Sequence, residues 1–178
     1  MSNYRRYFIK EHPIFITMVT YNRKDILTNN IDLLRTSFKI TKKYYNFGVI
    51  AICVMPNHIH MILSLDDAKE LPQIIRTLKQ NFTKLIPEKD YPTDITESMK
   101  KRNEKGIWQR RYYDHVIRDE KDLVKHIDYI HYNPMKHCKI APKDWAYSSF
   151  AKFVKNNFYN VNWCNYDDKN SISEMELE

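Results

Sequence analysis

Glycine is scarce in this chain of 178 residues, which contains only Gly48 and Gly106. A phosphate-binding loop or a dinucleotide-binding fingerprint needs several closely spaced glycines, so the sequence argues against nucleotide-driven chemistry. Cysteine is scarce as well, because Cys53, Cys138 and Cys164 are the only three and lie far apart. They predict neither a disulfide framework nor a Cys-x-x-Cys metal site.

Long hydrophobic runs are also missing. The longest apolar stretch, residues 47–55, has nine residues, which is fewer than the roughly 20 that a helix needs to cross a bilayer. The opening "MSNYRRYFIKEHPIF" contains no apolar segment of signal-peptide length. We therefore expect a cytoplasmic protein with no membrane partner.

Basic and aromatic residues are abundant and often adjacent. The net charge is +7, and several of the 13 tyrosines stand beside Arg or Lys, as in "YRRYF", "KKYY" and "RRYY". Basic groups can neutralise phosphates and aromatic rings can stack on unpaired bases, so this pattern favours a nucleic-acid partner. A basic protein with no such partner remains the alternative. The end of the chain, from Asp167, is instead acidic.

The hydrophobic pattern predicts one α+β fold. Alternation and β-branched residues predict strands over residues 13–21, 47–55, 58–65 and 107–117. Helical spacing predicts helices over residues 28–45, 70–85 and 120–133, and polar residues 87–106 predict a long surface loop. We expect the third helix to end at Asn133, because Pro134 follows. The order predicts a ferredoxin-like sandwich, an antiparallel sheet with helices, plus an extra helix toward the C-terminus that carries Tyr129.

His58 and His60 open the third predicted strand, in "MPNHIHMIL". Side chains alternate across a strand, so both imidazoles lie on one face and can converge on one metal ion. Histidines that only form local hydrogen bonds are the alternative. The amide of Asn133 is a sound third ligand for Mg²⁺ or Mn²⁺, although Asn133 could instead be a helix cap.

Tyr129 and Asn133 are four residues apart and therefore share a face of the third helix. A phenol beside a divalent ion can attack a phosphodiester, which gives a covalent phosphotyrosine and a free 3′-hydroxyl. The bond energy is retained, so the strand can be rejoined without ATP. Lys125, one turn before Tyr129, could assist the phenol or contact phosphate, or it could be a solvated lysine.

These residues resemble a known family. "MPNHIHMIL" is similar to the HUH motif of single-tyrosine HUH transposases. "WQRRYYDHVIRDEKDLVKHIDYIHYNPMKH", with "YRRYFIK" and "DWAYSSF", resembles the REP-associated tyrosine transposase branch. The resemblance implies a transposase domain over residues 1–150 and a C-terminal extension over 151–178, acidic and partly disordered at its end. It implies a nucleoid-associated enzyme that cuts and rejoins single-stranded DNA with imperfect hairpins, acting as a monomer or a homodimer.

The resemblance also assigns roles to residues. Tyr129 is the expected nucleophile, and His58, His60 and Asn133 are the expected ligands of Mg²⁺ or Mn²⁺. Expected DNA contacts are Arg5, Arg6, Lys10, Arg110 and Arg111, and residues expected to support the site from outside are His115, His126 and Lys125.

Two other functions fit parts of the sequence. A domesticated, non-catalytic protein that binds DNA hairpins would keep the fold, but the intact set of Tyr129, His58, His60 and Asn133 argues against decay. A metallohydrolase with His-x-His at a strand end is the other alternative. Such barrels need about 250 residues, which is more than this chain has.

Overall fold

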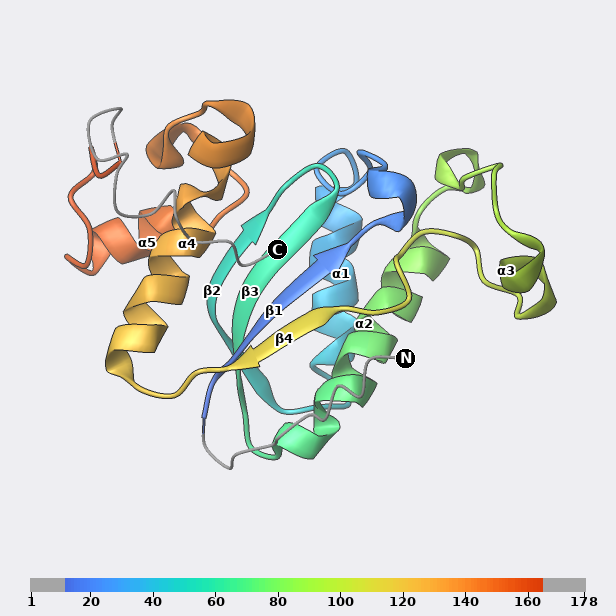
Figure 1. Cartoon of the computed structure of the whole chain (residues 1–178), viewed down its shortest axis with the longest axis horizontal. Helices are drawn as coiled ribbons and strands as arrows, with labels where there is room; N and C mark the ends of the chain where they lie inside the picture. Colours follow the sequence, from blue (N-terminus) through green and yellow to red (C-terminus); the bar gives the residue numbers. More distant parts are fainter. Residues whose placement is uncertain (1–11, 165–178) are drawn as a thin grey trace.

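The computed structural model describes residues 12–164 and has a four-stranded antiparallel sheet at its centre (Figure 1). Its strands are β1 (Ile14–Val19), β2 (Phe47–Val54), β3 (His58–Leu65) and β4 (Tyr113–Val116). Their order across the sheet is β2-β3-β1-β4, and each neighbouring pair is antiparallel. This order confirms the ferredoxin-like α+β sandwich. Within residues 12–164, no helix is both long and apolar enough to cross a membrane.

Helices cover both faces of this sheet, and one short helix, Glu97–Lys101, lies in the long loop beyond it (Figure 1). They are α1 (Ile31–Thr41), α2 (Leu71–Leu85), α3 (Glu97–Lys101), α4 (Glu120–Cys138) and α5 (Phe150–Lys155). Four short 3-10 helices accompany them, Tyr21–Arg23, Ala68–Glu70, Glu88–Asp90 and Pro142–Asp144. Figure 1 shows α1 and α2 side by side on one side of the sheet and α4 with α5 on the other.

Each face of the sheet has its own apolar core. On β1, Ile14, Ile16 and Met18 join the cluster that packs against α1 and α2. Phe15 points to the opposite face, where it joins Ile62 of β3 in the cluster beneath α4. Alternation along a strand explains this division. The face that carries His58 and His60 is therefore covered by α4 rather than open.

The predicted end of the third helix is wrong, because α4 continues through Pro134 to Cys138. Proline lacks one backbone N–H, which removes one helical hydrogen bond, but the following turn is closed by other means. Lys139 takes a left-handed conformation (φ 60°) and donates its N–H to the Met135 carbonyl, and Ile140 donates to the Pro134 carbonyl. This cap stabilises one extra turn that carries two further polar residues.

The segments around the sheet differ from expectation in two places. The fourth strand is shorter than residues 107–117, because β1 ends at Val19 and offers residues 107–112 only an isolated bridge between Thr20 and Trp108. The loop over residues 87–106 contains α3, whose Met99 side chain is buried. Residues 150–164 pack against α4 through Phe150 and neighbouring aromatic rings, whereas the predicted disordered end lies outside the described residues.

Candidate active site

Two histidines of β3 lie beneath α4. His58 pairs with Val19 and His60 with Thr17 on the neighbouring strand β1, so the sheet fixes both backbones. Both side chains are buried, and their ring centroids are 4.9 Å apart. The sequence prediction that the two imidazoles share one face is therefore confirmed.

Hydrogen bonds orient both rings. His58 Nδ1 lies 2.7 Å from Asn57 Oδ1, and His60 Nδ1 lies 2.8 Å from Thr17 Oγ1. If each Nδ1–H donates to its oxygen, each Nε2 keeps a lone pair. This is the tautomer that a metal-binding histidine uses, because the second ring nitrogen is then held by a neighbouring group.

Asn133 of α4 faces this pair. Its Nδ2 donates to the Tyr129 carbonyl at 2.9 Å, which assigns the amide orientation and leaves Oδ1 directed at His58 Nε2, 3.3 Å away. Two lone pairs at this distance repel one another unless a cation or a proton lies between them. The donor set of two imidazole nitrogens and one amide oxygen therefore fits a divalent cation.

Tyr129 lies beside the same histidines. Its side chain is 1% exposed, and its ring centroid is 5.2 Å from that of His60 and 6.1 Å from that of Phe15. Lys136, two residues past Pro134, donates from Nζ to Tyr129 Oη at 3.5 Å and lies 5.1 Å from the centre of the ring. The tyrosine ring and the amide of α4 thus lie beside the two imidazoles of β3 within one chain.

A second cluster contains His115, Asp122 and His126, whose ligand atoms lie within 4.8 Å of one another. His115 Nε2 donates to Asp122 Oδ2 at 2.9 Å, and the Arg118 backbone N–H donates to the same oxygen at 3.0 Å. Burial by itself would raise the pKa of Asp122, but these hydrogen bonds and the nearby positive charge lower it to about 2.

Hydrogen bonds within this cluster hold β4 to α4, so we call it a brace and do not assign it as a metal site. His126 Nδ1 donates to the Asp122 carbonyl at 2.8 Å, and the rings of His126 and His115 stack with their centroids 4.6 Å apart. Stacked rings do not direct two lone pairs at one ion, and the Asp122 carboxylate already has hydrogen-bond donors. The cluster joins β4 to the first turn of α4, two turns before Tyr129.

Comparison with known proteins identifies the family. The model of the family "Transposase IS200 like" matches residues 8–133. The chain belongs to this transposase family. It is 43% identical to a REP-associated tyrosine transposase of Haemophilus influenzae over 166 residues, 92% of this chain and 93% of the relative. It is 32% identical to the REP-associated tyrosine transposase of Escherichia coli K12, over 92% and 91% of the two chains.

A solved structure agrees with these relatives. It is a REP-associated tyrosine transposase bound to a REP hairpin, with a TM-score of 0.78 and 29% identity, and the match covers 99% of this chain and 96% of that one. The resemblance to the REP-associated branch is thereby confirmed, and the chain is a transposase with the fold predicted for it.

Sequence reasoning placed some residues of this transposase well and missed others. Lys125 is exposed, and Tyr129 instead receives its hydrogen bond from Lys136. Helical side chains lean toward the N-terminus, so a lysine that follows a tyrosine covers it better than one that precedes it. His137 was also missed, and its ring centroid is 5.0 Å from that of His58. Lys136 is seven residues after Tyr129 and His137 is four residues after Asn133, and both are helical spacings. The predicted helix end at Asn133 concealed them.

The other predicted residues lie at the surface or outside the described part. Arg110 and Arg111 are exposed, and Arg110 is 3.2 Å from Glu104. The predicted contacts Arg5, Arg6 and Lys10 lie outside the described residues. The neighbouring Tyr132 is buried beside the segment that contains Cys164, and burial, with the Cys164 thiol nearby, raises its pKa.

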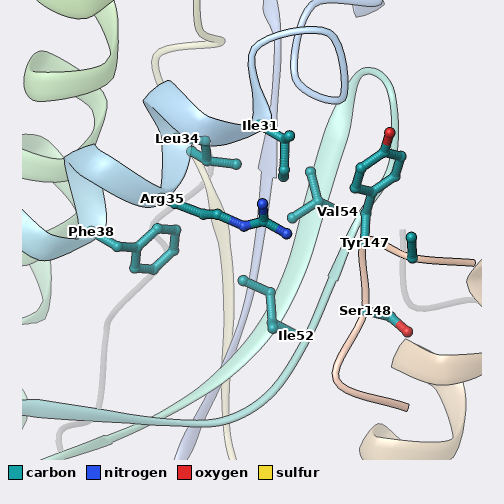
Figure 2. A pocket seen from close by; sticks show the side chains of 9 residues that line it. Ile31, Leu34, Arg35, Phe38, Ile52, Val54, Tyr147 and Ser148 are labelled. Carbon is teal, nitrogen blue, oxygen red and sulfur yellow. The ribbon is translucent and has the colours of Figure 1, made fainter. Parts of the chain in front are cut away.

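A hollow of about 200 Å³ lies between α1, β2 and residues 146–148 (Figure 2). Figure 2 shows Arg35 projecting over it, and this guanidinium lies 2.9 Å from the Asp32 carboxylate. Val54 of β2 lines the hollow and belongs to the core on the α1 and α2 face. The hollow is therefore on the opposite face of the sheet from His58 and His60.

Proposed function

We propose that this transposase cleaves and rejoins single-stranded DNA at sites flanked by imperfect hairpins, with Tyr129 as its nucleophile. The observation that carries the proposal is the meeting of the Tyr129 ring with the ring of His60, 5.2 Å between centroids, in one chain. No second subunit is required to complete this set of residues. A hairpin substrate is supported by the related structure, which holds a REP hairpin.

His58 Nε2, His60 Nε2 and Asn133 Oδ1 would hold the divalent ion, Mg²⁺ or Mn²⁺. When bound, such an ion withdraws charge from a phosphodiester and makes its phosphorus a better electrophile. None of the three side chains adds a negative charge, so nothing in this ligand set opposes the approach of a phosphate.

The chain's own residues perform the covalent step. The Tyr129 oxygen forms a bond to phosphorus, and the bond from phosphorus to the 3′-oxygen breaks. The phenolic proton is lost and the 3′-oxygen gains one, which leaves a 5′-phosphotyrosine and a 3′-hydroxyl. Attack by another 3′-hydroxyl reverses the same exchange, so joining needs no nucleotide cofactor.

Incubation with DNA tests this proposal. Single strands copied from the hairpin repeats beside the transposase gene are mixed with the protein and Mg²⁺ or Mn²⁺, and covalent adducts are separated under denaturing conditions. We expect an adduct whose modified peptide contains Tyr129, no adduct with Tyr129→Phe, and an undiminished adduct with Tyr132→Phe. An adduct that persists in Tyr129→Phe would identify another nucleophile.

The same experiment separates an enzyme from a binding protein. If the wild-type chain binds the hairpin strand but gives no adduct with either metal ion, the chain is instead a domesticated protein that binds DNA hairpins without cleaving them. Omission of metal in the presence of EDTA is expected to abolish the adduct while hairpin binding persists, because the phosphate contacts that hold DNA do not need the ion.

A further inference from the structure

The helical turn beyond Pro134 brings a positive charge to the centre of the site. Lys136 is seven residues after Tyr129, almost two full turns, so both side chains lie on the same face of α4. The lysine leans back over the tyrosine and reaches both its ring and its oxygen. A helix that ended at Asn133 would not place it there.

We propose that Lys136 positions the Tyr129 oxygen for attack and contacts the scissile phosphate. The proposal rests on the function proposed above and deepens it, because it assigns the cation that the chain itself contributes. As the phenolic proton leaves and the bond to phosphorus forms, negative charge lies on the phenol oxygen and on the phosphate oxygens. An ammonium already aimed at that oxygen needs little reorganisation to stabilise both.

Burial supports this role. Tyr129 is almost fully buried, whereas Lys136 is only half-buried and keeps its ammonium 3.5 Å from the phenol oxygen. A phosphodiester that reaches the phenol oxygen therefore comes within reach of this ammonium. The charge of a lysine is compact and suits a phosphate oxygen.

The positive charge of Lys136 can also attract a phosphate. Within the described residues, no ion pair joins Lys136 to a carboxylate, in contrast to Arg110 with Glu104 or Arg35 with Asp32. Its side-chain contacts are to an aromatic ring and a phenol oxygen, so no carboxylate among the described residues neutralises its charge before a phosphate arrives. A lysine that served only to hold the helix would be expected to pair with an acid on a neighbouring turn.

The test compares variants of the full-length protein on one probe. The probe is the single-stranded hairpin repeat from beside the gene, labelled at its 3′ end, because the 3′ fragment is the part that stays attached to tyrosine. Lys136→Met keeps the aliphatic stem over the ring and removes the charge, Lys136→Arg keeps a charge, and Lys121→Met on the exposed first turn of α4 is the control. Initial rates of adduct formation and hairpin affinities are measured for each.

We expect Lys136→Met to lower the rate of adduct formation on the order of 10²-fold, as the loss of one aimed donor does elsewhere. Its hairpin affinity is expected to change little, Lys136→Arg to recover most of the rate, and Lys121→Met to match wild type. Unchanged rates in Lys136→Met, or no recovery in Lys136→Arg, would overturn the proposal while leaving Tyr129 as nucleophile. If wild type forms no adduct, the proposed function and this assignment fail together.

Retained hairpin binding shows that a variant is folded. Should Lys136→Met lose binding and structure together, Lys136→Gln provides the same comparison with a polar side chain that tolerates the half-buried position. A rate in Lys136→Gln equal to that of wild type then overturns the proposal, and a deficit that Lys136→Arg repairs supports it.

Discussion

Replacement of Asp122 by Asn tests whether the brace between β4 and α4 stabilises the fold. The Asp122 carboxylate is 7% exposed and accepts hydrogen bonds from His115 and from the backbone and side chain of Arg118. An asparagine keeps the size of the side chain but removes its charge. It also places an amide N–H₂ where one acceptor oxygen stood, so a donor faces a donor.

The lowered pKa gives the magnitude. A pKa of about 2, in place of the ordinary 3.8, corresponds to about 2.5 kcal/mol of stability at neutral pH. Solvent screening reduces this figure, because His115 is partly exposed and the Arg118 side chain is largely exposed, so about 1–2 kcal/mol is expected. Since the folded-state pKa of Asp122 is depressed, this contribution is complete above the unfolded pKa near 4 and is lost as the pH falls toward 2.

Urea unfolding at pH 7 measures this difference. We expect Asp122→Asn to lower the free energy of unfolding by about 1–2 kcal/mol, seen as a lower urea midpoint with an unchanged slope. The difference from wild type should stay constant between pH 8 and 5 and should shrink below pH 4. Asp32→Asn, at an exposed carboxylate on α1, serves as the control and should cost less than about 1 kcal/mol.

Two results would refute this reasoning. A loss below about 0.5 kcal/mol would place Asp122 among ordinary surface positions. A loss that appears only without EDTA would mean that His115, Asp122 and His126 bind a metal ion rather than brace the helix. In that second case, wild-type stability itself should fall when the chelator is added.

Three further changes have expected outcomes. His60→Gln should abolish saturable Mn²⁺ binding, measured by the paramagnetic resonance of free Mn²⁺, because one nitrogen of the proposed ligand set is lost; unchanged binding would place the ion elsewhere. Tyr159→Phe removes the 2.6 Å hydrogen bond to the half-buried Asp128 and should cost about 1–3 kcal/mol in urea unfolding; an unchanged midpoint would contradict this. Asp119→Ala removes the cap of α4, in which Asp119 accepts from the Asp122 N–H at 2.8 Å, and should lower the thermal midpoint by the equivalent of about 1 kcal/mol.

The sheet could be predicted from the sequence because local patterns dictate it. His58, His60 and Ile62 alternate with purely apolar residues, and only one register places both sets in their own cores. The same pattern placed the two imidazoles on one face without reference to any other element. Tyr129 and Asn133 were likewise predictable as neighbours, because they are separated by about one helical turn.

The contacts across elements could not be predicted in the same way. Whether α4 covers the face with His58 depends on the packing of both cores, which no single segment specifies. Pro134 was the most misleading residue, since a proline usually ends a helix and here costs only one hydrogen bond near a well-capped end. Lys136 and His137 were missed for that reason.

The geometry of α4 also limits how Tyr129 can move. Tyr129, Asn133 and Lys136 follow one another at helical spacing, so they move as one rigid body relative to His58 on β3. Asp122, in the first turn of the same helix, is held to His115 of β4, so this contact resists a displacement of α4 as a whole. Asp122→Asn should therefore loosen the tyrosine from the histidine pair while leaving the pair itself in place.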